Sequence, residues 1–169
     1  MLPCNGLLLG RVRRYAGAVS KAIVVGVDGS DASIDALRWA ADEARLRATT
    51  LRAVHAWSFI PVQPIGDPGM LAMPAGDLAG QLGAENEAAR RSLEDALSEA
   101  LGSEPDLELE QRLVEGDAGD ALVAESATAE LVVVGSHGRT GLKAALLGSV
   151  SRHVVSHAAC PVVVVKASD

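Results

Sequence analysis

Three glycines and a serine near the C-terminus have the types and the spacing that suit a phosphate site. Gly135 follows a short apolar run, Gly138 comes three positions later, and after nine further residues Gly148 and Ser149 open a segment with helical spacing. Glycine lets the main chain turn sharply and approach a ligand closely. The first N–H groups of a helix have no partner within it, so together with a serine hydroxyl they can bind a phosphate. The pattern therefore predicts an anion site in this segment.

The charge distribution favours the same segment. Residues 131–168 contain no Asp or Glu but contain four basic residues, Arg139, Lys143, Arg152 and Lys166, which give a formal charge of +4. Because the whole chain has a net charge of −7, the rest of it carries −7 − 4 = −11. This distribution favours a small anion, with Arg139 and Lys143 as candidate phosphate ligands. Nucleic acid is not expected as a partner, because it would require a larger basic surface.

The turn after the first apolar segment, residues 21–27, holds a second candidate, Asp28. Its carboxylate can cap a helix, bind a ribose hydroxyl or help to hold a divalent ion near phosphates. Ser30 or Asp31 is expected to cap the helix that follows, because each can accept a hydrogen bond from the free N–H groups. Asp28 is also the only acid expected near the phosphates, so no dedicated general base and no catalytic residue is predicted.

Metal sites, disulfides and membrane spans are not predicted. His153 and His157 are four residues apart but lack a third ligand. Cys4 and Cys160 are far apart in sequence, which favours a reducing, cytoplasmic compartment. Residues 1–20 lack the charge-then-apolar order of a secretory signal and are expected to form a loose extension. No apolar run reaches the roughly 18 residues that a membrane span needs.

The elements that must position these candidates alternate along the chain. Apolar runs predict strands at 21–27, 50–57, 107–114, 131–134 and 162–165, and helical spacing predicts helices at 32–48, 77–101, about 117–128 and after residue 148. Strict alternation indicates one α/β domain, a doubly wound, parallel five-stranded sheet with helices on both faces. Ligands bind such sheets where the winding reverses, so Asp28 and Gly135 face each other if the first and fourth strands flank that point.

One segment, residues 58–76, is expected to be irregular, because it contains four prolines. A loop of this length is usually a lid or a disordered insertion. The helix that follows is expected to turn one row of leucines inward, namely Leu78, Leu82, Leu93, Leu97 and Leu101.

The motif and its surroundings resemble the ATP-binding branch of the universal stress protein family. Gly135, Gly138, Gly148 and Ser149 match that branch's spacing of Gly, two residues, Gly, nine residues and Gly-Ser, and VGVDGS, AVHAW, VVVGSHGR and CPVVVV are also similar. The resemblance covers residues 21–166. It implies the strand order 3-2-1-4-5 and a bound ATP that can carry Mg²⁺. By position it implies nucleotide contacts from Gly26, Val27, Asp28, Ala56, Gly135, Gly138, Gly148, Ser149, Val150 and Ser151.

The function that this resemblance implies is a nucleotide-dependent regulatory module of the stress response, which acts on an unidentified protein. A homodimer through Val162–Val165 is also expected, because unpaired edge strands invite association and family members commonly dimerise there. The alternative is a slow ATPase or a nucleotidyl-transferring enzyme; a flavodoxin-like carrier is a weaker third possibility. Substitution of Gly135 by valine, or of Gly148 by glutamate, is expected to abolish nucleotide binding and leave the fold intact.

Overall fold

A computed structural model describes residues 22–58, 75–103, 105–138 and 147–167. Five parallel strands form one sheet in the order β3-β2-β1-β4-β5. The elements are β1 Ile23–Gly26, α1 Asp31–Arg47, β2 Leu51–Trp57, α2 Ala75–Leu101, β3 Leu109–Glu115, α3 Ala118–Ser126, β4 Leu131–Gly135, α4 Ser149–His157 and β5 Val162–Val165. The predicted fold class and the strand order implied by the resemblance are therefore confirmed.

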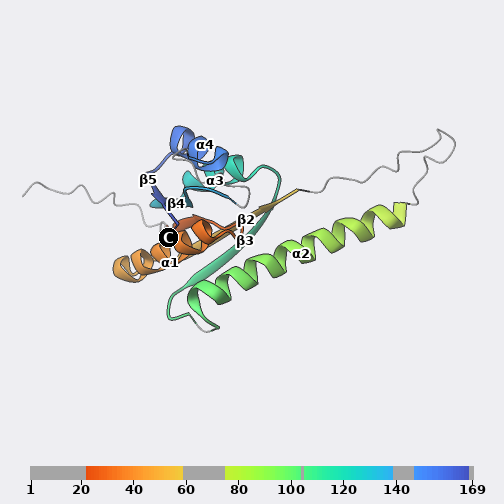
Figure 1. Ribbon diagram of the computed structural model, residues 1–169, viewed down its shortest axis with the longest axis horizontal. Helices are drawn as coiled ribbons and strands as arrows, with labels where there is room; N and C mark the ends of the chain where they lie inside the picture. The colour runs from red at the N-terminus through yellow and green to blue at the C-terminus, as the bar shows by residue number, and fades with distance from the viewer. Residues whose placement is uncertain (1–21, 59–74, 104, 139–146, 168–169) are drawn as a thin grey trace, which may run out of the picture.

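Two helices cover each face of the sheet (Figure 1). One apolar cluster joins α1 and α2 to one face through residues such as Leu37, Leu51 and Leu93. The other cluster includes Val24, Val132, Leu122 of α3 and Val154 of α4. β1 to β3 are wound in one direction and β4 to β5 in the other, so the winding reverses between β1 and β4. All carboxyl ends lie at one edge, because the strands are parallel.

α2 departs in two respects from the sequence expectation. It begins at Ala75, so the last two residues of the segment 58–76 are helical. Leu82, which was expected to face inward, has an exposed fraction of 38%. The amino-terminal part of α2 projects beyond the sheet (Figure 1), and the first buried residue among the described side chains of this helix is Ala89, so leucine spacing continues where there is no sheet to cover. The side chain of Leu78 lies outside the described residues. The loop 59–74 and the extension 1–20 lie outside the described residues.

Three arginines form ion pairs between distant segments at the end of the sheet where the strands begin. Each binds two carboxylates: Arg45 binds Asp42 and Asp106, Arg47 binds Glu43 and Glu130, and Arg52 binds Glu110 and Glu125. Burial lowers the pKa of Arg52, but its two hydrogen bonds outweigh that effect and the net pKa is raised. The hydrogen bond from Arg45 lowers the pKa of Asp106. These contacts stabilise the end of the sheet at which the strands begin. The candidate site lies at the other end, where the strands finish.

Candidate functional site

The turn after β1 is organised by Asp28 and Ser30. Asp28 Oδ1 accepts hydrogen bonds from the Ser30 N–H at 3.0 Å and the Ser30 hydroxyl at 2.6 Å. Ser30 Oγ also accepts from the Ser33 N–H at 3.3 Å, so Ser30 is the cap of α1 and Asp31 is an acid of its first turn. Gly29 has a φ of +78°, a conformation that favours glycine. The turn therefore holds the Asp28 carboxylate in a defined direction.

The turns after β1 and β4 lie side by side, as the sequence predicted. The Ser30 hydroxyl lies 3.4 Å from the carbonyl oxygen of His137. A Cβ atom built on Gly138 would lie 2.7 Å from Asp28 Oδ2, which is closer than a real Cβ contact. Glycine at position 138 therefore leaves room for the carboxylate. Asp28 and Gly138 are more than one hundred residues apart in sequence and meet because β1 and β4 are paired.

The amino terminus of α4 is fixed to the end of β4. The N–H of Gly148, the N-cap residue, donates to the Ser136 carbonyl at 2.8 Å, and the Ser151 hydroxyl donates to the Gly135 carbonyl at 2.6 Å. The Arg152 N–H forms the first bond of the helical ladder, to the Gly148 carbonyl, so the preceding N–H groups of α4 have no partner within the helix. Gly148 provides no side-chain cap. This helix end can therefore receive an anion.

The predicted glycines do not share one role. A Cβ atom on Gly135 would lie 2.8 Å from the main-chain carbonyl of Ala32 in α1, and one on Gly26 would lie 2.8 Å from Cδ1 of Leu122 in α3. Both glycines allow close packing of a helix on a strand. The expectation that valine at position 135 would leave the fold intact is therefore wrong, because its side chain would meet main chain of α1 rather than open ligand space.

The remaining predicted residues are divided between the two faces. Val27 is 4% exposed and belongs to the α1/α2 cluster, so only its main chain is available to a ligand. Ala56 is half-buried on β2 and points to the same face as Val54, toward α3 and α4. Val150 packs against the α3/α4 cluster, and Ser151 is 4% exposed with its hydroxyl bound to Gly135. Arg139 and Lys143 lie outside the described residues.

His55 lies within the segment AVHAW but is absent from the predicted site, although it contacts the site's first turn. Its ring lies on β2 with an exposed fraction of 5%, and Nδ1 is 2.7 Å from the carbonyl oxygen of Val27. Strand alternation places His55 on the same face as Leu51 and Ala53, and a polar residue there is the signal that could have identified it. Its partner could not be identified, because that depends on the register of β1 and β2.

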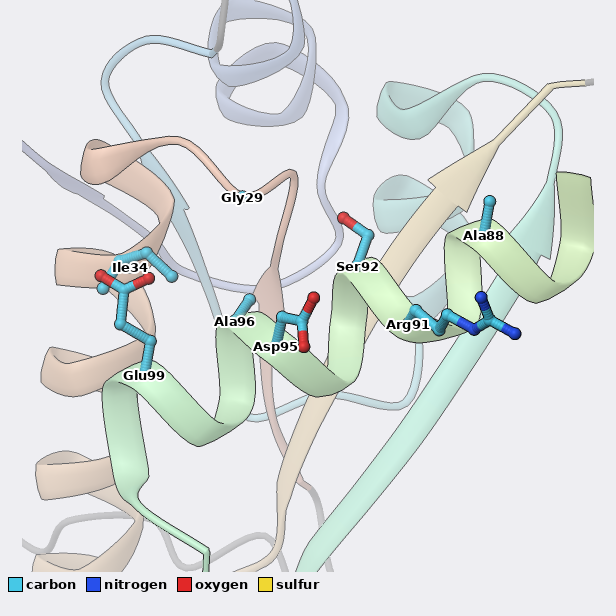
Figure 2. A pocket seen from close by; sticks show the side chains of 8 residues that line it. All are labelled: Gly29, Ile34, Ala88, Arg91, Ser92, Asp95, Ala96 and Glu99. Carbon is cyan, nitrogen blue, oxygen red and sulfur yellow. The ribbon is translucent and has the colours of Figure 1, made fainter.

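An open groove of about 430 Å³ lies on the α1/α2 face, on the far side of the Asp28 turn from α4 (Figure 2). Ser92 points toward Gly29, and Ile34 forms part of the opposite wall. Of the predicted site's two turns, only the first contributes to the groove, through Gly29. Apart from Ile34 of α1, its other lining residues come from α2, so the groove is separate from the amino end of α4.

His153 contacts α3, and His157 stacks on His153. Their rings stack with centroids 4.4 Å apart, and His153 Nε2 lies 3.1 Å from Asp120 Oδ1. In the described part of the chain, no group of three or more His, Cys, Asp or Glu residues could hold a metal ion. Likewise, none of the described helices is long and apolar enough to cross a membrane.

Comparisons with known sequences point to one family. The model of the universal stress protein family matches residues 20–166. A universal stress protein of Mycobacterium tuberculosis is 40% identical over 146 residues, which cover 86% of this chain and 45% of the relative. One of Mycolicibacterium smegmatis is 36% identical over 145 residues, which cover 85% of this chain and 45% of the relative. The chain thus spans less than half the length of these relatives.

Solved structures are similar in fold. The universal stress protein UspA from Lactobacillus plantarum superposes with a TM-score of 0.66 at 22% identity, covering 88% of this chain and 99% of that one. A universal stress protein crystallised in complex with cAMP gives a TM-score of 0.52 at 28% identity, covering 88% of this chain and 98% of that one.

Proposed function

The chain belongs to the universal stress protein family, and we propose that it binds ATP, with Mg²⁺ on the phosphates, as a nucleotide-dependent regulatory module in the stress response. The observation that carries the proposal is the contact between the turn of Asp28 and the turn of Gly138 beside the amino end of α4. A carboxylate and a set of helical N–H groups at one place suit the two ends of a nucleotide. The related protein crystallised with cAMP supports a nucleotide ligand.

The proposed contacts follow from these positions. The N–H groups of Ser149, Val150 and Ser151 would bind phosphate oxygens, with Arg139 as a further ligand. The Asp28 carboxylate would bind a ribose hydroxyl or a Mg²⁺ ion, and the main chain of Gly26 and Val27 would lie along the nucleoside. Ala56 would contact the base. A module of this kind changes its affinity for a regulated protein in the cytoplasm when nucleotide binds.

Direct analysis of bound nucleotide tests this proposal. The purified protein is heat-denatured and the supernatant is chromatographed, and calorimetry then measures the Kd for ATP with and without Mg²⁺ and for cAMP. Co-purified ATP, or a micromolar Kd for ATP, is the expected result. Rapid production of ADP from added ATP would indicate the ATPase instead, and FMN in the supernatant would indicate a flavin carrier. A protein that binds no nucleotide in any of these assays would overturn the proposal.

We further propose that β5 forms a homodimer interface. The Val132 N–H donates to the carbonyl of Pro161, just before β5, and the Ser136 N–H donates to the carbonyl of Val165, so the odd-numbered residues of this segment turn their main chain toward β4. The main-chain groups of Val162 and Val164 therefore face the open edge, where a second copy can pair. Large apolar side chains are also exposed on the helices of both layers, namely Trp39 and Leu46 on α1 and Val155 on α4.

A proline at position 164 tests this interface. Val164→Pro removes an outward N–H and leaves the bonds between β4 and β5 in place, whereas Val164→Ala keeps that N–H. Light scattering is expected to give a dimer for the wild type and the alanine variant and a smaller mass for the proline variant. A dimer of unchanged stability in Val164→Pro would exclude pairing through this edge.

A further inference from the structure

His55 occupies the position at which the main-chain pairing of β1 and β2 ends. Among the described residues, the last main-chain bond between these strands runs from the Val27 N–H to the Val54 carbonyl, at 2.9 Å. If the ladder continued, the Val27 carbonyl would accept from the N–H of Ala56. Instead it accepts from His55 Nδ1 at 2.7 Å. The imidazole therefore replaces a main-chain donor where the chain leaves the sheet to form the turn of Asp28.

The peptide unit between Val27 and Asp28 is held at both ends. Its carbonyl is bound by His55, and its N–H lies 3.4 Å from the hydroxyl oxygen of Ser33. The orientation of this unit sets the direction in which the Asp28 side chain leaves the main chain. Because Asp28 Oδ2 lies only 2.7 Å from the position that a Cβ atom of Gly138 would take, a rotation of this unit would move the carboxylate against the second turn or away from it.

His55 lies among apolar side chains, where a polar ring that only filled space would be energetically unfavourable. The other buried residues on this face of β2 are Leu51 and Ala53, and both are fully apolar and 0% exposed. A polar ring in such a cluster loses its hydration and is compensated only if its nitrogen is hydrogen-bonded. The bond to Val27 provides this compensation, and a carbonyl oxygen can only accept, so Nδ1 carries the proton.

We propose that His55 is a positioning residue for nucleotide binding: its Nδ1–H fixes the carbonyl of Val27 and thereby the Asp28 carboxylate beside Gly138. This inference rests on the proposed function of the site. It assigns a role to a side chain that touches no nucleotide and lies on the opposite face of β2 from Ala56. The role depends on a donor at one ring position and not on the size of the ring.

Substitution of His55 by asparagine or by glutamine separates the need for a hydrogen-bond donor at the Nδ1 position from the need for the volume of the ring. The amide nitrogen of His55→Asn takes the place of Nδ1 and can donate to Val27, whereas that of His55→Gln lies near the position of Nε2. A space-filling role favours glutamine, which is closer to histidine in volume, and a donor role favours asparagine. His55→Leu removes the donor altogether and serves as the reference for its complete loss.

Two measurements on the full chain test the proposal. In calorimetry, His55→Asn is expected to keep the Kd for ATP within about threefold of the wild type, and His55→Gln and His55→Leu to raise it about tenfold, the effect of one lost hydrogen bond. In hydrogen exchange without nucleotide, peptides spanning residues 27–30 are expected to exchange faster in the glutamine and leucine variants but not in the asparagine variant. Melting temperatures identify any variant that does not fold.

The outcomes distinguish this inference from the proposed function. If the wild type binds no nucleotide, the proposed function fails, and the exchange rates of residues 27–30 then decide whether His55 fixes the turn. If the wild type binds ATP but the asparagine variant binds no better than the glutamine variant, the positioning role is overturned while the nucleotide site stands. Equal exchange in both variants would also overturn it.

Discussion

Gly148 is the position at which one substitution should separate anion binding from folding. Its φ of −59° and ψ of 163° are accessible to any residue, so no strain arises from a side chain. The atom nearest to an added Cβ would be the Ser136 carbonyl oxygen at 3.4 Å, which is an ordinary van der Waals contact. Gly148→Glu and its uncharged isostere Gly148→Gln are therefore both expected to fold.

The charge of the glutamate is expected to act on stability and on binding with opposite signs. A carboxylate at the amino end of a helix stabilises it by about 0.3–1 kcal/mol through the helix dipole. The same carboxylate would lie about 5 Å from a bound phosphate, and at an effective dielectric constant of about 20–35 the repulsion per unit charge is about 2–3 kcal/mol. The Kd for ATP should therefore be about 30-fold to 150-fold higher in the glutamate variant than in the glutamine variant.

Calorimetry at low and high salt, together with thermal melting, measures both effects. We expect the difference in Kd between the two variants to shrink at 1 M salt, because salt screens exposed charges, while the glutamate variant melts no lower than the glutamine variant. A glutamate variant that binds ATP within threefold of the glutamine variant would refute the assignment of phosphate to this end of α4. A glutamate variant that melts far below the glutamine variant would contradict the expected stabilisation of α4 by a carboxylate at its amino end.

The remaining predictions concern stability. Gly135→Ala should lower the free energy of unfolding by about 1–3 kcal/mol, because its Cβ would lie 2.8 Å from main chain of Ala32; an unchanged urea midpoint would contradict this packing role. Arg52→Met should cost about 1–2 kcal/mol, because the side chain is only 14% exposed and two carboxylates would lose their shared cation; urea unfolding measures it, and a more stable variant would show that desolvation of the arginine outweighs the pairing. Asp106→Asn should destabilise the protein at neutral pH and have no effect in acid, because Arg45 lowers the pKa of Asp106 below the ordinary 3.8 and the stabilisation is lost as the pH falls through that lowered pKa; equal differences in unfolding free energy at pH 7 and in strong acid would contradict it.

The order of the elements and the meeting of the two turns could be predicted from the sequence. Alternating apolar runs indicate parallel strands, and a sheet that is wound both ways brings the ends of two strands together at the reversal. Asp28 and Gly138 meet at that point. A cap by Ser30 or Asp31 was predicted because each side chain can accept a hydrogen bond from the free N–H groups of the helix, and Ser30 is the one that caps α1.

The roles of single side chains could not be predicted, because they depend on direction and register. The glycine spacing does not say which way a Cβ atom would point, and at Gly135 it points into α1. Leu82 has helical spacing, but nothing in the sequence states where the sheet beneath α2 ends. His55 is found only when the register places it next to the Val27 carbonyl.

Residues 131–168, the segment without Asp or Glu, carry positive charge that no described carboxylate pairs with. Every described arginine on α1, α2, β2 and β3 forms an ion pair with a carboxylate. Of the described basic residues, only Arg152 and Lys166 form no ion pair, and both belong to the segment 131–168, which contains no acid. Arg152 lies in the first turn of α4, and Lys166 follows the carboxyl end of β5. Because the other described arginines are paired with carboxylates, the unpaired positive charge lies in the segment that holds the proposed phosphate site, where it would favour an anion in an otherwise acidic protein.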